Sequence, residues 1–297
     1  MLLKKSQSLA ALAAFRPNVS RLQYRWMKLP SSVWIWLLLS CGIPGPESSV
    51  EDISGLPRRM YAGEISDAKT ISALVAGNPD GQQVIFIHGT PGSAEGWADY
   101  LITVPPGFQY LALDRPGFGW SGPDHAVVSM ADQAKAVSLL FENHSGRKPI
   151  LVGHSLGGPI AAWVAATQPD ALSGIVIVAG SLDASQERIH PLQRLGASWP
   201  IRTLLPRSVR NANRELMALK TELKSLHPLL EKVRVPVVIV HGTEDDLVSY
   251  QNVEFMQRNL TGTKKVTLKG LEGFNHFLPW MARAHIQAAI MDLAEKY

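Results

Sequence analysis

The stretch GHSLGG at residues 153–158 sets Ser155 between small residues at a sharp turn. The apolar run ILVGH (150–154) before it is typical of a strand, and LGGPIAAWVAATQ (156–168) after it is typical of a helix. A strand-to-helix turn of the G-x-S-x-G type forces the serine into a strained backbone, and its glycines leave room for neighbouring chain. It also aims the free N–H groups of the helix N-terminus at the hydroxyl. This pattern predicts that Ser155 is a nucleophile.

Other motifs accompany this turn along the chain. They are HGTPGS (88–93), DRPGFGWS (114–121), HGTEDDLV (241–248) and GFNHFLPW (273–280). In this order, and at these places after predicted strands, they resemble the motifs of the α/β-hydrolase superfamily over roughly residues 61–297. The resemblance implies a catalytic triad in the chain order serine, aspartate, histidine.

The resemblance assigns the base and the acid of this triad. His276 lies in the loop that the family uses for the base, after the last short strand. Family members read H-G-x-x-D-x-x-V in the preceding motif, which maps the acid onto Asp245. Two alternatives stay open: the adjacent Asp246, where proline is common in the family, and Asp183, which follows the strand predicted at 174–180.

Three other histidines lie within or beside these motifs. His88 and His241 end buried strands, so we expect them to be hydrogen-bonded structural groups. His154 points the wrong way to act as the base, because it is the immediate neighbour of Ser155.

Attack by serine places negative charge on the substrate carbonyl oxygen, and two preset N–H donors stabilise that charge. The N–H of Leu156, the residue after the nucleophile, is one candidate. In HGTP the second donor must be Thr90, because Pro91 has no N–H. We interpret Asp114 and the loop after it as structural, with Trp120 as a candidate pocket wall.

Continuous apolar runs and amphipathic stretches alternate along the folded part of the chain. The predicted strands are 84–88, 110–114, 150–154, 174–180, 237–241 and the shorter 265–268. The predicted helices are one capped by Ser129 with Asp132 and running to about Asn143, then 156–168, 250–260 and 280–297. This alternation predicts an α/β fold with a mostly parallel central sheet and helices on both faces, the α/β-hydrolase fold of the resemblance.

The interval at about 181–233 interrupts this alternation, because several prolines divide short amphipathic pieces and no strand-like run occurs in it. We interpret it as a small helical cap inserted over the active site. The alternative is a long crossover helix that packs on the sheet without touching substrate.

Composition excludes several classes of function. Residues 1–40 hold six Lys and Arg and no acid, which leaves 23 basic and 25 acidic residues in the remainder. The folded part is therefore not basic, and no basic stripe indicates nucleic-acid binding. The single cysteine, Cys41, allows no internal disulfide and no cysteine-based metal site. No metal or nucleotide motif occurs, so we expect no cofactor.

The N-terminal segment is typical of a targeting signal. The run VWIWLLL (33–39) is shorter than the ~20 residues of a membrane span. With the basic residues before it and Cys41 after it, it resembles a bacterial lipoprotein signal, which implies lipidation of Cys41, a start at Met27 and attachment facing the periplasm or the outer surface. Residues 1–40 would be the signal and 41–60 a tether. An organelle transit peptide and an uncleaved tail are the alternatives.

Together these patterns predict a serine hydrolase that acts on a small acyl substrate, most simply a carboxylic ester, through an acyl-enzyme. A C–C bond hydrolase, a peptidase of small substrates and an acyltransferase would use the same triad. A non-catalytic binding protein with this fold is the alternative from another class.

Overall fold

The computed structural model of the chain describes residues 55–142, 146–263 and 265–296. The predicted signal at 1–40, the alternative start at Met27, Cys41 and most of the predicted tether at 41–60 lie outside these residues. In the described part, no helix has the length and apolar character needed to cross a membrane.

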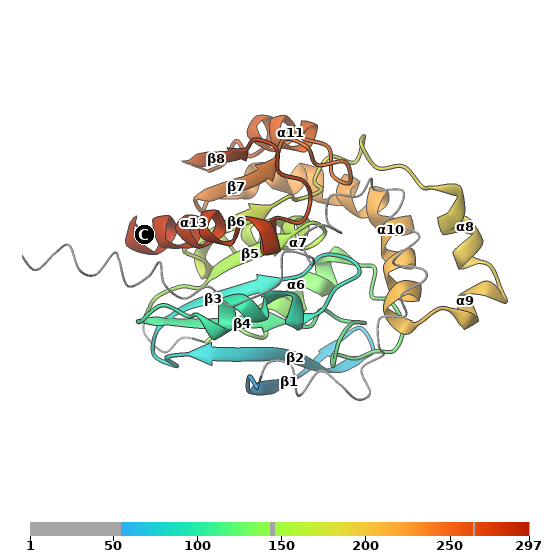
Figure 1. The fold of residues 1–297 in the computed structure, drawn as a ribbon, viewed down its shortest axis with the longest axis horizontal. Coiled ribbons are helices and arrows are strands. Elements are labelled where there is room, and N and C mark those ends of the chain that lie inside the picture. The colour runs from blue at the N-terminus through green and yellow to red at the C-terminus, as the bar shows by residue number, and fades with distance from the viewer. Residues whose placement is uncertain (1–54, 143–145, 264, 297) are drawn as a thin grey trace, which may run out of the picture.

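The described residues form one eight-stranded sheet in the order β1-β2-β4-β3-β5-β6-β7-β8, and Figure 1 shows it running through the molecule. The strands are β1 (Arg58–Ile65), β2 (Ala68–Gly77), β3 (Gln82–Ile87), β4 (Phe108–Leu113), β5 (Ile150–His154), β6 (Gly174–Val178), β7 (Val237–Gly242) and β8 (Val266–Leu271). The pairs from β4 to β8 are parallel, which confirms the predicted mostly parallel sheet. β1 and β2 add antiparallel pairing at one edge.

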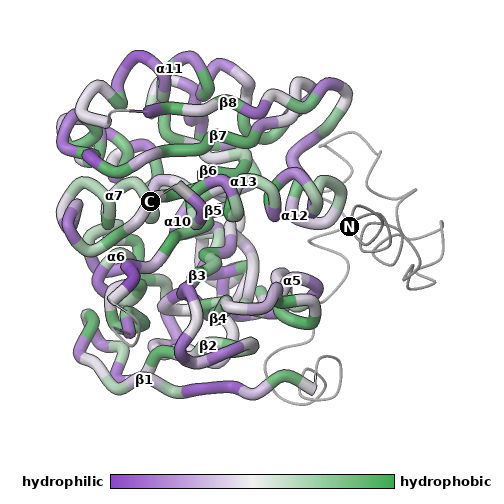
Figure 2. Tube along the Cα trace, turned by 90° about the vertical axis from the view of Figure 1, so that its left-hand side faces the viewer, coloured by the Kyte–Doolittle hydropathy of each residue, from purple (hydrophilic) through white to green (hydrophobic). Residues whose placement is uncertain are grey.

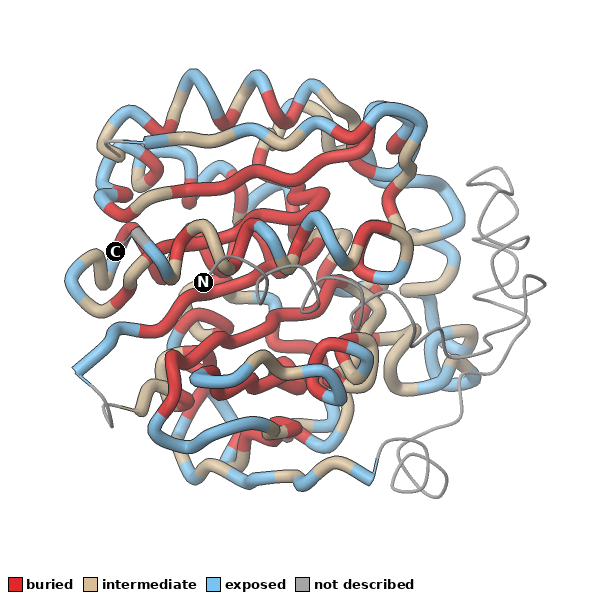
Figure 3. Tube along the Cα trace, turned by 60° about the vertical axis from the view of Figure 1, so that its left-hand side comes forward, coloured by how far each residue is buried: buried red, intermediate tan, exposed pale blue. Residues whose placement is uncertain are grey.

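The edge strand β1 lacks the continuous apolar run by which the central strands can be predicted. Its side chains are mostly exposed or half-buried, whereas every residue of β3 to β7 is buried. An edge strand with one wet face has no reason to be apolar throughout. Figure 2 shows hydrophobic residues concentrated along the central strands, and Figure 3 shows the same strands as the buried part of the molecule.

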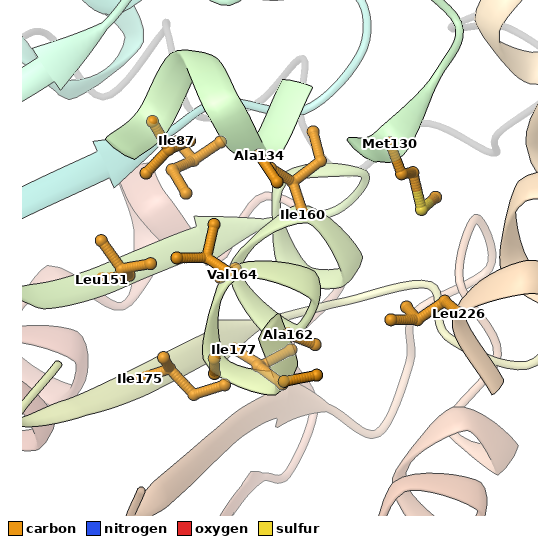
Figure 4. Packing of buried hydrophobic residues seen from close by; sticks show 14 of the residues in the cluster. Ile87, Met130, Ala134, Leu151, Ile160, Ala162, Val164, Ile175, Ile177 and Leu226 are labelled. Carbon is orange, nitrogen blue, oxygen red and sulfur yellow. The ribbon is translucent and has the colours of Figure 1, made fainter. Parts of the chain in front are cut away.

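Helices cover both faces of the sheet. They are α5 (Ala98–Ile102), α6 (Met130–Ser138), α7 (Gly157–Thr167), α8 (Pro191–Ala197), α9 (Ile201–Leu204), α10 (Arg207–Leu226), α11 (Gln251–Asn259), α12 (Leu278–Met281) and α13 (Arg283–Lys296), with 3₁₀ turns η2 (Ala94–Trp97), η3 (Pro169–Ala171) and η4 (His227–Lys232). Alternate side chains of a strand point to opposite faces. Ile175 and Ile177 of β6 therefore belong to the cluster that contains buried residues of α6, α7 and α11, part of which Figure 4 shows, while Val176 and Val178 belong to the cluster on the other face that contains buried residues of α5 and α13.

The predicted helices are present with changed bounds. Ser129 caps α6 as predicted, because its Oγ accepts a hydrogen bond from the N–H of Asp132 at 3.2 Å. α6 ends at Ser138 rather than near Asn143, since the N–H groups of Leu140 and Phe141 turn to acceptors three residues back. The C-terminal helix is divided into α12 and α13.

The segment between β6 and β7 contains α8, α9, α10 and η4. The long α10 packs against the core through its buried face, which includes Leu219, Leu223 and Leu226. α8 and α9 lie outside α10, away from the sheet (Figure 1). The segment thus combines a helix packed on the core with an outer arm.

Candidate active site

Ser155 occupies a strained turn between β5 and α7, with a φ of 53°. Only glycine fits on either side of it. A Cβ on Gly153 would lie 2.2 Å from the carbonyl oxygen of Gly157, and one on Gly157 would lie 2.3 Å from the carbonyl oxygen of Ile87. Neighbouring backbone is therefore packed directly against the turn. Such strain in a non-glycine residue is typical of functional sites.

The HGTP loop after β3 lies against this turn, since a Cβ on Gly89 would be 2.8 Å from the Cβ of Ser155. The Gly89 carbonyl accepts a hydrogen bond from Arg115 Nη2 at 3.0 Å. In a trans peptide the N–H points opposite to the C=O. The N–H of Thr90 is therefore directed away from Arg115. The other predicted donor, Leu156, stands at the N-terminus of α7, where N–H groups have no intrahelical acceptor.

Asp245 and His276 are brought together from the ends of two neighbouring strands. His276 Nδ1 lies 2.8 Å from Asp245 Oδ2, and both side chains are buried. The other carboxylate oxygen, Oδ1, accepts hydrogen bonds from the backbone N–H groups of Leu247 at 3.0 Å and Val248 at 2.8 Å. Because the carboxylate can only accept, Nδ1 of His276 carries the proton and Nε2 is left as a base.

The surroundings of Asp245 favour its ionised form. Burial alone would raise its pKa, but the hydrogen bond and charge of His276 and the N–H of Val248 outweigh burial and hold the pKa below its ordinary value. Neither alternative acid occupies an equivalent place. Asp246 is exposed, and Asp183 Oδ1 accepts a hydrogen bond from the N–H of Ser185.

His154 supports the loop that carries His276. Its Nε2 lies 3.0 Å from the carbonyl oxygen of His276, so it is the donor, and the two rings lie 4.8 Å apart. The rings of Trp97 and Trp280 stand nearly perpendicular to the His154 ring, with centroids 6.5 and 5.9 Å from it. His154 therefore links the serine turn to the histidine loop, a role that the sequence does not reveal.

In the described part of the chain Ser155 Oγ makes no hydrogen bond to His276. Hydrogen bonds between catalytic groups are often long without substrate and tighten only when substrate is bound.

Acid is expected to destabilise the fold through His154. Burial, followed by the charge of His276, lowers its pKa from 6.5 to about 3. Between pH 6.5 and about pH 3 the unfolded chain therefore binds a proton at His154 that the folded chain does not bind. The free energy of unfolding falls as the pH drops through this range, by up to about 1.4 kcal/mol per pH unit. In a His154→Gln variant, which keeps a donor for the His276 carbonyl, urea unfolding between neutral pH and about pH 5 should show a slope lower by this amount. An unchanged slope would contradict the assignment.

His88 and His241 are hydrogen-bonded structural groups, as the sequence predicts. His88 Nε2 accepts from the N–H of Arg115 at 3.1 Å, and its Nδ1 lies 2.7 Å from the Gly89 carbonyl. His241 Nε2 lies 2.9 Å from the Val248 carbonyl. Burial is the largest cause that lowers the pKa of both rings, so both are held neutral.

Asp114 has a structural role, as the hydrogen bonds of its carboxylate show. Its carboxylate accepts hydrogen bonds from the N–H of Ala94 at 2.8 Å and the N–H of Trp120 at 3.2 Å, and it pairs with Arg58. It thereby ties the loop after β3 to the loop after β4. The Arg58 guanidinium lies over the Trp120 ring, with its central carbon 5.5 Å from the ring centroid, and Trp120 is partly exposed.

A buried ion pair fastens α10 to the site. Arg115 Nη1 and Nη2 donate to the two carboxylate oxygens of Glu215 at 2.7 and 2.9 Å, and neither side chain is more than 3% exposed. The same guanidinium donates to the carbonyls of His88 and Gly89. One side chain thus holds both the HGTP loop and the helix above it.

Replacing Glu215 with glutamine is expected to lower the free energy of unfolding by about 3 to 5 kcal/mol, because the buried Arg115 charge loses its partner. Urea unfolding measures the change. The matched control is Glu254→Gln in the exposed pair with Arg258, 3.9 Å apart, where a change under about 0.5 kcal/mol is expected. Equal effects of the two substitutions would show that the buried pair contributes no more than the exposed one.

Comparison with known proteins identifies the family of this arrangement. Residues 83–229 match the sequence model of the alpha/beta hydrolase fold. The non-heme chloroperoxidase of Streptomyces lividans is 26% identical over 255 residues, which cover 71% of this chain and 91% of that protein. The chain belongs to the α/β-hydrolase superfamily. For three further curated relatives, this hydrolase spans 34, 45 and 63% of their length.

Solved structures show the same fold. The monoacylglycerol lipase of Paleococcus ferrophilus aligns with a TM-score of 0.61 at 20% identity, over 76% of this hydrolase and 98% of the lipase. The 2-hydroxy-6-oxo-6-phenylhexa-2,4-dienoate hydrolase of Rhodococcus sp. strain RHA1 aligns with a TM-score of 0.61 at 18% identity, over 81% and 99% of the two chains. At these identities the likeness establishes the fold alone.

Proposed function

We propose that this hydrolase cleaves a carboxylic ester through an acyl-enzyme, with Ser155 as nucleophile, His276 as base and Asp245 as the group that orients the base. The observation that carries the proposal is the 2.8 Å contact between Asp245 and His276, in a loop held beside the strained Ser155 turn. A serine, a base and an orienting acid are the parts that acyl transfer requires.

The proposed reaction proceeds in two halves. Ser155 Oγ attacks the ester carbonyl carbon while His276 Nε2 takes the hydroxyl proton, and the N–H groups of Leu156 and Thr90 stabilise the oxyanion. Collapse of the tetrahedral intermediate breaks the ester C–O bond, and His276 gives its proton to the departing alcohol. Water then attacks the acyl-enzyme with His276 again as base, which releases the acid and restores Ser155.

The preset position of the Thr90 N–H supports this mechanism. Arg115 and His88 both contact the Gly89 carbonyl, so the peptide that carries this N–H is held in one orientation before substrate arrives. A donor fixed in advance stabilises the transition state without reorganisation during the reaction.

The test uses the full chain and p-nitrophenyl esters from acetate to laurate, together with a fluorophosphonate that modifies activated serines. We expect ester turnover and a single modified peptide that contains Ser155, with the best acyl length reporting the size of the substrate pocket. Modification without ester turnover would favour C–C bond hydrolysis, peptidase activity or acyl transfer by the same serine. Absence of both would favour a binding role and overturn the proposal.

A further inference from the structure

The outer part of the segment between β6 and β7 forms an arm. We call residues 188–206, which include α8 and α9, the cap arm. α8 contacts α10, and both short helices project beyond it from the body of the molecule (Figure 1). This arrangement gives the cap arm one supported side and one side in water.

The cap arm turns its apolar side chains towards water. Leu204 is 81% exposed, Trp199 75% and Leu195 53%, and Ile189 and Leu192 are also exposed. The side that faces α10 is polar and small instead. Asn213 Nδ2 donates to the Gln193 carbonyl at 2.8 Å, and a Cβ on Gly196 would lie 3.4 Å from the same nitrogen. Surface helices of soluble proteins pack their apolar stripe on the core, and an exposed apolar cluster marks an interaction site.

The same region carries an uncompensated positive charge. Residues 188–214 contain six arginines and no Asp or Glu. Arg207 and Arg210 are used in holding α10, since they donate to backbone carbonyls of the loop at 119–124 and pair with Asp124. Within the described residues, four exposed arginines have no ion pair or hydrogen bond: Arg188, Arg194, Arg202 and Arg214. Exposed apolar side chains and free cations therefore lie together.

We propose that the cap arm docks on a lipid bilayer that carries anionic headgroups. Trp and Leu side chains enter the boundary between headgroups and acyl chains, and arginines bind the headgroup phosphates, which is how basic amphipathic segments bind membrane surfaces. The charge argues for this occupant over a second copy of the chain, because a two-fold interface would set the same arginines against each other. The proposal does not depend on the proposed reaction.

A label on the cap arm tests the docking locally. In the full chain with Cys41→Ser, Ser198→Cys places an environment-sensitive fluorophore between Leu195 and Trp199. Asp80→Cys, in the exposed turn between β2 and β3, is the matched reference. With vesicles of equal parts phosphatidylcholine and phosphatidylglycerol, the fluorophore at 198 should brighten and shift to the blue, and the one at 80 should not. Residues 1–54 are the same in both proteins, so their own affinity for vesicles contributes equally.

Substitutions separate the contributions of charge and apolar surface. Arg194→Gln with Arg202→Gln should weaken binding to the anionic vesicles by about 30-fold, since each basic residue near such a surface contributes about fivefold. Lys224→Gln with Lys232→Gln removes the same charge from the C-terminal end of α10 and from η4, which follows it, and should change binding by about twofold or less. Trp199→Ser with Leu204→Ser should abolish the blue shift. Thermal unfolding checks that each variant is folded.

Three results would overturn the proposal. The first is a fluorophore at 198 that does not respond to any vesicle. The second is an equal response to vesicles of phosphatidylcholine alone, which would remove the role of the arginines. The third is a response that depends on protein concentration without vesicles, which would assign the cap arm to contact between copies of the chain.

Discussion

Replacing Ser155 with alanine is expected to lower kcat for ester hydrolysis by about 10⁶-fold, to the background set by oxyanion stabilisation and binding alone. The loss is chemical rather than structural. Alanine, like serine, has a Cβ at the backbone position with φ of 53°, so the turn and its glycine contacts are unchanged. Steady-state kinetics with a p-nitrophenyl ester, alongside urea unfolding, measures both effects.

Two comparisons sharpen this prediction. His276→Ala should cause a loss of similar size, and the double variant should lose little more, because nucleophile and base act as one unit. Ser173→Ala is the matched control, because the Ser173 hydroxyl lies just before β6, donates to the Lys148 carbonyl before β5, and should not affect turnover. Retention of more than about one hundredth of the activity in Ser155→Ala would place the nucleophile elsewhere.

The central strands and the serine turn could be predicted from sequence because their causes are local. Strands buried on both faces need apolar residues at every position, which leaves a continuous run in the sequence. The glycines around Ser155 are required by backbone contacts within the turn and with β3. β1 leaves no such signal, because it lies at the sheet edge with much of its surface in water.

The choice among acids depends on geometry that sequence spacing does not contain. Asp245 and Asp246 are neighbours, and the family pattern favours the first of them. The structure shows why neighbours differ: the turn after β7 directs Asp245 inward, where the N–H groups of Leu247 and Val248 hold one carboxylate oxygen, while Asp246 faces solvent.

Long-range polar contacts around the site have no sequence signal. Arg115 and Glu215 are 100 residues apart, and His154 and His276 are 122 apart. A glutamate in an amphipathic helix is ordinarily a solvated residue, and only the placement of α10 over the loop after β4 buries it. The exposure of the apolar side of the cap arm also depends on the placement of helices. Sequence periodicity shows that a helix has an apolar stripe, but it does not show whether that stripe is covered by the rest of the molecule.

The substitution Asp245→Asn is expected to lower kcat by about 10⁴-fold with little change in stability or KM. Its reason lies in the hydrogen bonds around the carboxylate. The N–H groups of Leu247 and Val248 need an acceptor, so the amide oxygen of asparagine takes the place of Oδ1. The amide NH₂ then faces His276 Nδ1 as a donor, which forces the proton of the ring onto Nε2. The histidine keeps its position but presents a donor where the serine proton must be accepted.

Asp246→Asn and Asp183→Asn provide matched controls for this argument, because each makes the same change in charge and shape at an acid that, within the described part of the chain, forms no hydrogen bond or ion pair with His276. Both should retain kcat within about twofold of the wild type, since neither affects the protonation of the His276 ring. A larger loss in either control than in Asp245→Asn would assign the orienting acid to that residue. Rates of Asp245→Asn measured at increasing pH distinguish a wrong tautomer from a changed protonation equilibrium. Raising the pH should not restore activity, because a neutral ring that carries its proton on the wrong nitrogen is not corrected by a lower proton concentration.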